Sequence, residues 1–138
     1  MTQSCAQILV VDDEAFIRLT LGALLRRQGY AVWTAADAQE AFMWLREGAF
    51  DLLLIDLMLT DRVSGLDIAE CARISQPNAA VLILTGSGEL DATVGDASRM
   101  QFETMFKTAS PQDVLDRVAV LLTRQQRLYE RARAADER

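Results

Sequence analysis

The chain has 138 residues, enough for one ordinary domain, and its 51% hydrophobic and 25% charged residues are typical of a globular protein. It contains no histidine, which excludes Ser-His-Asp and Cys-His catalysis, histidine-ligated zinc and a phosphohistidine relay residue on this chain. Cys5 and Cys71 form no CxxC pair and no disulfide framework, which favours a reducing cytoplasm, and the net charge of −6 argues against direct nucleic-acid binding.

Short apolar runs alternate along the chain with segments of helical periodicity. The predicted strands are 8–11, 30–34, 52–55, 80–84 and 104–106. The predicted helices are 14–28, 37–48, 66–75, 89–100 and a last one that begins at Pro111. Asp37 with Glu40 and Ser110 are expected to cap helix N-termini, and Gly29 a C-terminus. Apolar strands separated by helices predict a parallel sheet covered on both faces, a doubly wound three-layer α/β domain of (βα)5 type.

Neither export nor a membrane span is expected. The first apolar run, Ile8–Val11, stops at Asp12 and is too short for the core of a signal peptide. The longest nearly apolar run, Leu52–Leu59, is interrupted by Asp56, so no transmembrane helix is expected.

The last helix is expected to continue past the domain. Its apolar stripe ends at Leu122, so the domain is predicted to span 6–122 and a charged helical tail 123–138. The tail carries a net charge of +2 and the remainder −8. It is either a solvated helix or an arm that contacts a partner or a second copy through Leu122, Leu128 and Tyr129.

Polar residues follow the predicted strands where each strand ends. Asp12 and Asp13 follow the first strand, Asp56 the third, Thr85 the fourth and Lys107 the fifth. Because ligands of open parallel sheets bind beyond the carboxyl ends of the strands, these side chains are expected to converge. A single aspartate after a strand is usually a turn or cap residue, but five such residues at one edge are hard to explain by structure alone.

The convergence of three carboxylates requires positive charge. Two carboxylates about 4 Å apart repel by roughly 4 kcal/mol at an effective dielectric of about 20. Lys107 supplies one positive charge, and a divalent cation would supply more. A site of several carboxylate oxygens suits Mg²⁺, which prefers octahedral oxygen ligands.

Four segments resemble the receiver domain of response regulators in two-component signalling: ILVVDDE at 8–14, LLLIDLML at 52–59, VLILTG at 81–86 and MFK at 105–107. The resemblance covers about residues 6 to 122 and includes the spacing between these segments. It implies a flavodoxin-like fold with strand order 2-1-3-4-5.

The resemblance also implies roles for individual residues. Asp56 would be the phosphoacceptor, whose carboxylate attacks the phosphohistidine of a sensor histidine kinase or a histidine phosphotransfer protein. Mg²⁺ would be held directly by Asp13, through water by Asp12, by Asp56 and by the backbone carbonyl of Met58.

Further residues would handle the phosphoryl group. Lys107 would pair with one phosphoryl oxygen, and Thr85 would move to hydrogen-bond another. Met58 and Ser87 would flank the path of the attacking water and set the lifetime of the phosphorylated state. Because Met58 is bulky and apolar, slow self-dephosphorylation is expected.

The sequence departs from the family pattern at several positions. Thr108 replaces the usual proline after Lys107, and a trans bond is predicted because a non-proline cis bond costs about 3–4 kcal/mol. Thr104 stands where receivers carry an aromatic residue that rotates inward. Phe102 or Phe106 would serve as that rotor, or would simply pack against a neighbouring helix. In the loop after Asp56, Thr60 replaces a proline and one extra residue precedes Gly65, so an unusual loop conformation is expected.

The resemblance implies a stand-alone signalling protein that changes its affinity for protein partners when phosphorylated. It would catalyse only its own phosphotransfer and dephosphorylation. Its target would bind the face formed by the helix at 89–100, the strand at 104–106 and the last helix, and homodimer formation stays open. The alternative is an adaptor of the same fold that works without phosphorylation. The changes at Thr104, at Thr108 and in the loop near Thr60 favour it slightly, and the intact acid cluster disfavours it.

Two enzyme or cofactor functions fit poorly. A phosphatase of the haloacid-dehalogenase type needs a second acid two residues after its aspartate, where this chain has Met58. A flavodoxin-type flavin site needs a hydroxyl-rich phosphate loop after the first strand. Here Asp12, Asp13 and Glu14 would repel phosphate.

Overall fold

A five-stranded parallel sheet forms the centre of the fold. The computed structural model describes residues 5–59, 64–86, 102–107 and 109–136. The strands are β1 (Gln7–Val11), β2 (Ala31–Ala35), β3 (Leu52–Asp56), β4 (Ala80–Thr85) and β5 (Glu103–Phe106), in the order β2-β1-β3-β4-β5. The helices are α1 (Ala15–Arg27), α2 (Ala38–Glu47), α3 (Gly65–Ser75) and α5 (Pro111–Asp136). The predicted fold class and strand order are confirmed; the helix predicted at 89–100 lies outside the described residues.

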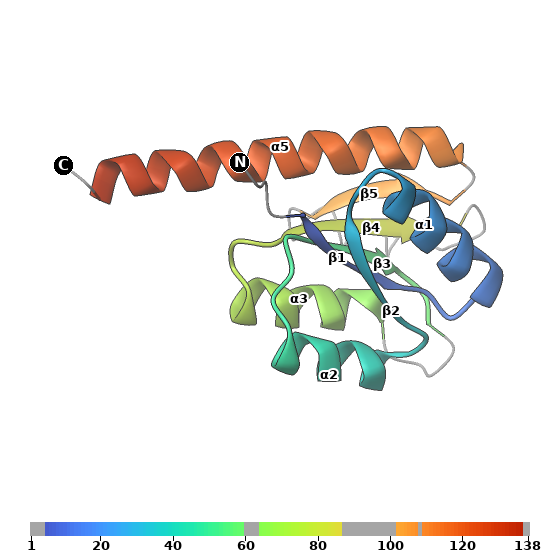
Figure 1. Cartoon of the computed structure of the whole chain (residues 1–138). Coiled ribbons are helices and arrows are strands. Elements are labelled where there is room, and N and C mark those ends of the chain that lie inside the picture. Colours follow the sequence, from blue (N-terminus) through green and yellow to red (C-terminus); the bar gives the residue numbers. More distant parts are fainter. Residues whose placement is uncertain (1–4, 60–63, 87–101, 108, 137–138) are drawn as a thin grey trace.

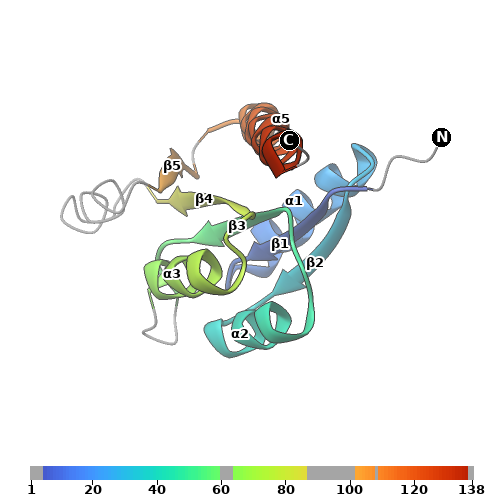
Figure 2. The same ribbon diagram turned by 90° about the vertical axis from the view of Figure 1, so that its left-hand side faces the viewer.

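The helices cover both faces of the sheet. Helices α2 and α3 lie on one face, and α1 and α5 lie on the other (Figures 1 and 2). Because both faces are covered, the central strands β1, β3 and β4 are largely apolar rather than alternating, and Leu52–Ile55 are all buried. The edge strands β2 and β5 are less completely buried. Each fully buried Leu or Ile contributes roughly 1.5–3 kcal/mol through removal of its side chain from water.

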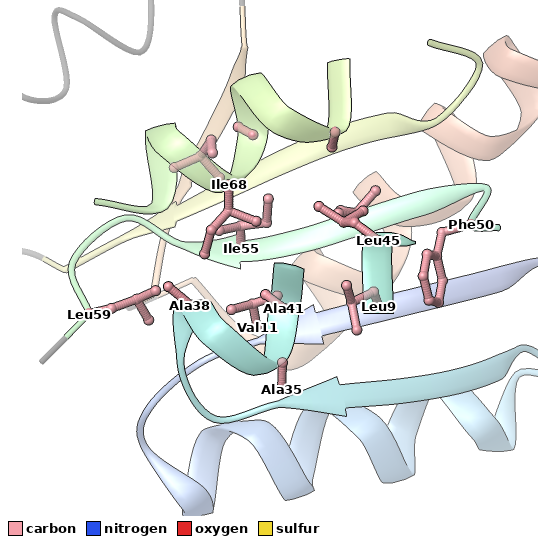
Figure 3. Close-up of a cluster of buried hydrophobic side chains, with 14 of the residues drawn as sticks. Leu9, Val11, Ala35, Ala38, Ala41, Leu45, Phe50, Ile55, Leu59 and Ile68 are labelled. Atoms are coloured by element: carbon pink, nitrogen blue, oxygen red, sulfur yellow. The ribbon is translucent and has the colours of Figure 1, made fainter. Parts of the chain in front are cut away.

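The sheet divides the hydrophobic core into two clusters. Leu9, Val11 and Ile55 point toward α2 and α3, where they pack with residues such as Leu45 and Ile68 (Figure 3). The alternate strand residues, among them Ile8, Val10 and Leu54, pack with α1 and α5. Strands β1 to β4 therefore each contribute side chains to both clusters, which holds their carboxyl ends in fixed positions.

Local signals define the helix ends as the sequence predicts. The Asp37 side chain accepts a hydrogen bond from the Glu40 backbone N–H (2.8 Å), and Glu40 Oε1 accepts one from the Ala36 N–H (2.7 Å). Ser110 Oγ accepts a hydrogen bond from the Asp113 N–H (3.1 Å) at the start of α5. Gly29 follows α1 with a φ of 96°, a left-handed conformation that favours glycine.

Helix α5 is the longest element, with 26 residues, and runs past the end of the sheet (Figure 1). It continues unbroken through the charged segment after Leu122. The Gln125 side-chain amide donates a hydrogen bond to the Asn78 carbonyl in the connection before β4. None of the helices in the described residues combines the length and apolar character that a membrane span needs.

Candidate functional site

The predicted site residues meet at the carboxyl-end edge of the sheet. Asp12 follows β1 directly, and Asp56 is the last residue of β3. Since β1 and β3 are neighbours, the two carboxylates lie side by side, and Asp13 joins them from the next position. One carboxylate oxygen from each of these three residues lies within 4.8 Å of the others. The structure therefore brings together the acid cluster that the sequence predicts.

Lys107, which follows β5, extends its ammonium group to the carboxylates of this cluster. Its Nζ lies 3.0 Å from Oδ2 of Asp56 and 3.2 Å from Oδ2 of Asp12. Its backbone N–H donates to the carbonyl of Thr85 (2.8 Å), the last residue of β4. Lys107 is thus fixed at its backbone to the neighbouring strand and at its ammonium to the two central carboxylates.

Glu14 is a third partner of Lys107 that the sequence analysis did not assign to the site. Its Oε1 lies 3.2 Å from Lys107 Nζ, and its side chain is largely exposed. The backbone N–H of Glu14 also donates to Oδ1 of Asp12 (2.9 Å), which holds the turn into α1. The run of three acidic residues at 12–14 could have indicated this contact. Glu14, the third of them, is however equally typical of a residue at the start of a helix.

Burial dominates the electrostatics of the site. Asp56 is 1% exposed, and its burial raises its pKa to about 7, with a further increase from the charge of Asp12 and an opposing effect of Lys107. Burial also raises the pKa of Asp12, against the hydrogen bond from Glu14 and the charge of Lys107. Burial alone would lower the pKa of Lys107, but its interactions with Asp56 and Asp12 outweigh that effect and raise it.

The donor set fits a divalent cation. Three carboxylates converge where Lys107 supplies one positive charge, so negative charge is in excess. Asp12 Oδ2 is buried and accepts no hydrogen bond within the described residues, although Lys107 Nζ is its ionic neighbour. A buried carboxylate oxygen that lacks a hydrogen bond is suited to ligate a metal ion.

The backbone around Asp56 is held by a close approach of α3. The Gly65 N–H donates to the Leu57 carbonyl (2.8 Å), and the Met58 N–H donates to Oδ1 of Asp56 (3.2 Å). A Cβ atom at position 65 would lie 2.2 Å from the backbone oxygen of Asp56, so only glycine fits there. The Met58 side chain is 52% exposed beside the site. The role of its backbone carbonyl as a metal ligand stays a prediction.

The remaining predicted residues are placed less centrally. Thr85 is buried, and its Oγ1 donates a long hydrogen bond (3.4 Å) to the Gly86 carbonyl. Phe102 is partly buried against the α2–α3 cluster, and the guanidinium of Arg73 from α3 lies 4.2 Å from its ring centroid. This is the packing alternative considered for Phe102, whereas Phe106 is 56% exposed at the end of β5.

Several sequence predictions fall outside the described residues. They concern the lifetime role of Ser87, the loop at Thr60 and the trans bond between Lys107 and Thr108. These stay predictions.

The chain is similar to response regulators in sequence and in structure. The response regulator receiver domain family model matches residues 8–119. The transcriptional regulatory protein ResD of Bacillus subtilis is 38% identical over an alignment of 125 residues that covers 86% of this chain and 48% of ResD. The chain spans about half or about a quarter of the length of the first curated relatives it matches.

Solved receiver structures share the fold. A CheY-like receiver domain protein from Methanospirillum hungatei has a TM-score of 0.83 at 27% identity, covering 90% of this chain and 98% of that one. The response regulator protein TrrA of Thermotoga maritima, solved in complex with Mg²⁺-BeF, has a TM-score of 0.72 at 30% identity, covering 84% and 98%. With its sheet order, its acid cluster and the match over most of its length, this chain belongs to the response regulator receiver domain family.

Proposed function

We propose that Asp56 is the phosphoacceptor of a two-component or phosphorelay pathway, and that its phosphorylation changes the affinity of the chain for protein partners. The observation that carries this proposal is the buried Asp56 carboxylate, with Lys107 Nζ 3.0 Å away and two further carboxylates beside it. The proposed receiver spans residues 6–122, followed by a helical extension at 123–138.

In the proposed reaction, an ionised oxygen of Asp56 attacks the phosphorus of a phosphohistidine on a sensor histidine kinase or a phosphotransfer protein. A P–O bond forms while the P–N bond breaks, and the imidazole nitrogen leaves with the electron pair and takes up a proton. Phosphoryl transfer requires in-line positioning and positive charge near the equatorial oxygens. Lys107 is placed to supply that charge, and the Thr85 hydroxyl is a donor for a second oxygen.

The proposed cofactor is Mg²⁺, held by the carboxylates of Asp12, Asp13 and Asp56 and by the backbone carbonyl of Met58. When bound, it supplies positive charge that neutralises the charge on the transferring group. The buried Oδ2 of Asp12, which lacks a hydrogen bond in the described residues, supports this assignment. The Mg²⁺-BeF complex of the similar protein TrrA supports it as well.

The phosphorylated state would end by hydrolysis. A water oxygen attacks the phosphorus, the P–O bond to Asp56 breaks, and the carboxylate and inorganic phosphate are released. Met58 and Ser87 are the proposed lifetime-setting residues. The chain would then be a self-modifying signalling protein rather than an enzyme acting on a separate substrate. The cytoplasm is its proposed location, and Cys5 and Cys71 are both free thiols.

The proposed output surface comprises β5, α5 and the helix predicted at 89–100. A change of conformation around Lys107 would reach this surface because Lys107 directly follows β5. The downstream partner is expected to be a protein rather than DNA.

The decisive experiment is intact-mass measurement after incubation with Mg²⁺ and a small donor such as acetyl phosphate or phosphoramidate. Wild type is expected to gain one phosphoryl group and Asp56→Asn none. Asp67→Asn, an exposed carboxylate in the first turn of α3, is the matched control and should behave as wild type. If wild type gains no phosphoryl group from either donor or from a histidine kinase, the phosphorylation-independent adaptor becomes the better explanation.

A further inference from the structure

The outer side of α5 carries a row of exposed side chains. Its inner side packs into the α1–α5 cluster through Val114, Val118 and Leu121. On its opposite side no other described segment covers the helix (Figures 1 and 2). At about 100° per residue, seven exposed residues of α5 lie there within an arc of about 80°: five between Asp113 and Arg127, followed toward the C-terminal end by Arg131 and Ala134. The first five residues of this row, called here the outer stripe, are Asp113, Asp116, Val120, Arg124 and Arg127.

The outer stripe is charge-symmetric about Val120. Asp116 and Arg124 are each four residues from Val120, and Asp113 and Arg127 are each seven. With a rise of about 1.5 Å per residue, the acids lie about 6 and about 10.5 Å on one side and the arginines at the same distances on the other. The stripe therefore becomes its own complement when it is turned end over end.

We propose that the outer stripe is the interface of an antiparallel dimer of this chain. A twofold axis through Val120 sets Asp116 opposite Arg124 of the second copy and Asp113 opposite Arg127 of the second copy. Both pairs occur twice, as in any interface in which one surface meets itself. The two Val120 side chains, each 47% exposed in the monomer, meet on the axis.

The charges of the stripe are only weakly engaged within the monomer. Arg124 lies 3.6 Å from Glu103 Oε1, an exposed and long ion pair. Arg127 has no ion pair within the described residues, and Asp116 accepts one hydrogen bond from Gln112 (2.8 Å). Exposed pairs of this kind contribute little and leave the charges available to a second copy.

Other occupants match the stripe less well. A parallel second copy would place acids against acids and arginines against arginines. A nucleic acid would meet Asp113 and Asp116 on a chain whose net charge is −6. An acidic helix would fit the arginine half and be repelled by the other half. A single helix face is smaller than a standard interface, so the dimer is expected to be weak and concentration-dependent.

Charge reversal tests the pairing directly. Asp113→Arg with Asp116→Arg makes the stripe all positive, and Arg124→Glu with Arg127→Glu makes it all negative. Each double variant alone is expected to sediment as a monomer near 15.3 kDa at concentrations where wild type approaches twice that mass. An equimolar mixture of the two is expected to form a heterodimer, and the variant with all four reversals is expected to dimerise again.

The controls separate this surface from folding and from net charge. Arg27→Glu with Arg46→Glu, on α1 and α2, changes the net charge as much as Arg124→Glu with Arg127→Glu does. It should leave the dimer intact. Val120→Glu should abolish it, and circular dichroism melts verify that every variant folds. The proposal would be overturned if wild type stayed monomeric at all concentrations. It would also be overturned if either double variant dimerised on its own, or if the equimolar mixture of the two formed no heterodimer. The inference does not depend on phosphotransfer at Asp56, and monomeric variants should still take up a phosphoryl group.

Discussion

Asp56, the proposed phosphoacceptor, carries a cost to folding. Its buried carboxylate has a pKa of about 7, against an ordinary value of 3.8. The folded state therefore binds more protons than the unfolded state between these pH values. By linkage, the free energy of unfolding decreases as the pH rises through this window.

We therefore predict that Asp56→Asn stabilises the metal-free protein. Above pH 7 the gain should be about 1–3 kcal/mol, since one pKa unit corresponds to about 1.4 kcal/mol and the lost pairing with Lys107 reduces the benefit. Thermal melts between pH 5 and pH 8 with a chelator present should show a smaller decrease with pH for the variant than for wild type. A lower melting temperature of Asp56→Asn at pH 8 would contradict this account.

Met58 provides a second test at the scale of a single residue. The apolar side chain of Met58 is half exposed, and the backbone N–H of Met58 donates a hydrogen bond to Oδ1 of Asp56. Met58→Asn should accelerate loss of the phosphoryl group several-fold, because an amide can hydrogen-bond and orient the attacking water. The decay of the phosphorylated mass measures the rate. Met58→Leu is the control and should decay as wild type does; an unchanged rate in Met58→Asn would argue against this role.

The sequence predicts the principal site residues because each stands at the end of a strand. Asp12, Asp56 and Lys107 need only the parallel sheet to meet at one edge. The contact of Glu14 with Lys107 could not be predicted in this way. It depends on side-chain reach from the start of α1 to the end of β5, which no local pattern encodes.

At the scale of elements, the contact between α3 and β3 positions the site. Gly65→Ala should destabilise the protein by about 1–3 kcal/mol, because the added methyl group would overlap the backbone oxygen of Asp56. It should also slow phosphorylation, since the shift falls on Asp56, the proposed phosphoacceptor. Denaturant melts and intact-mass time courses measure the two effects.

Gly22→Ala in α1 is the matched control. A Cβ atom there would meet neighbours at 3.5 Å or more, and alanine favours helix over glycine by about 1 kcal/mol. Equal losses of stability in both variants would contradict the steric argument at Gly65.

The helix ends follow from local chemistry, which is why Asp37 and Ser110 were predictable as caps. The hydrogen bonds that connect the C-terminal ends of α2 and α3 could not be predicted. The Gln76 side-chain amide donates to the carbonyls of Leu45 and Gly48, and its Oε1 accepts from the Phe50 N–H. This one side chain closes the connection between α2 and β3, and its partners are too far along the chain for periodicity to reveal.

For the whole molecule, Mg²⁺ should act as a stabilising ligand. Only the folded chain brings Asp12, Asp13 and Asp56 within 4.8 Å, so binding should shift the folding equilibrium. At about 100 times the dissociation constant the expected gain is about 2.7 kcal/mol. Melting curves over a Mg²⁺ series should rise for wild type and stay flat for Asp13→Asn, and a chelator should reverse the rise. An equal rise in that variant would place the metal elsewhere.

The parallel sheet could be predicted from apolar strands that alternate along the chain with helical segments, but the order of the strands could not. Periodicity states that β1 and β3 are buried on both faces, and it does not state that they are neighbours. The order came from the resemblance to receiver domains. It is this order that places the charges of Asp12 and Asp56 next to each other.

The starting point of α5 has a consequence for phosphate stoichiometry. The helix begins four residues after Lys107 and leads away from the acidic edge of the sheet. In the antiparallel pair inferred above, the two helix starts lie about 27 Å apart along the helix axis. The two acidic edges then face opposite ends of the assembly. A kinase docked at one end would leave the other end accessible. Phosphorylation of one copy should therefore not affect phosphorylation of the other, and dimers with zero, one or two phosphoryl groups should all occur.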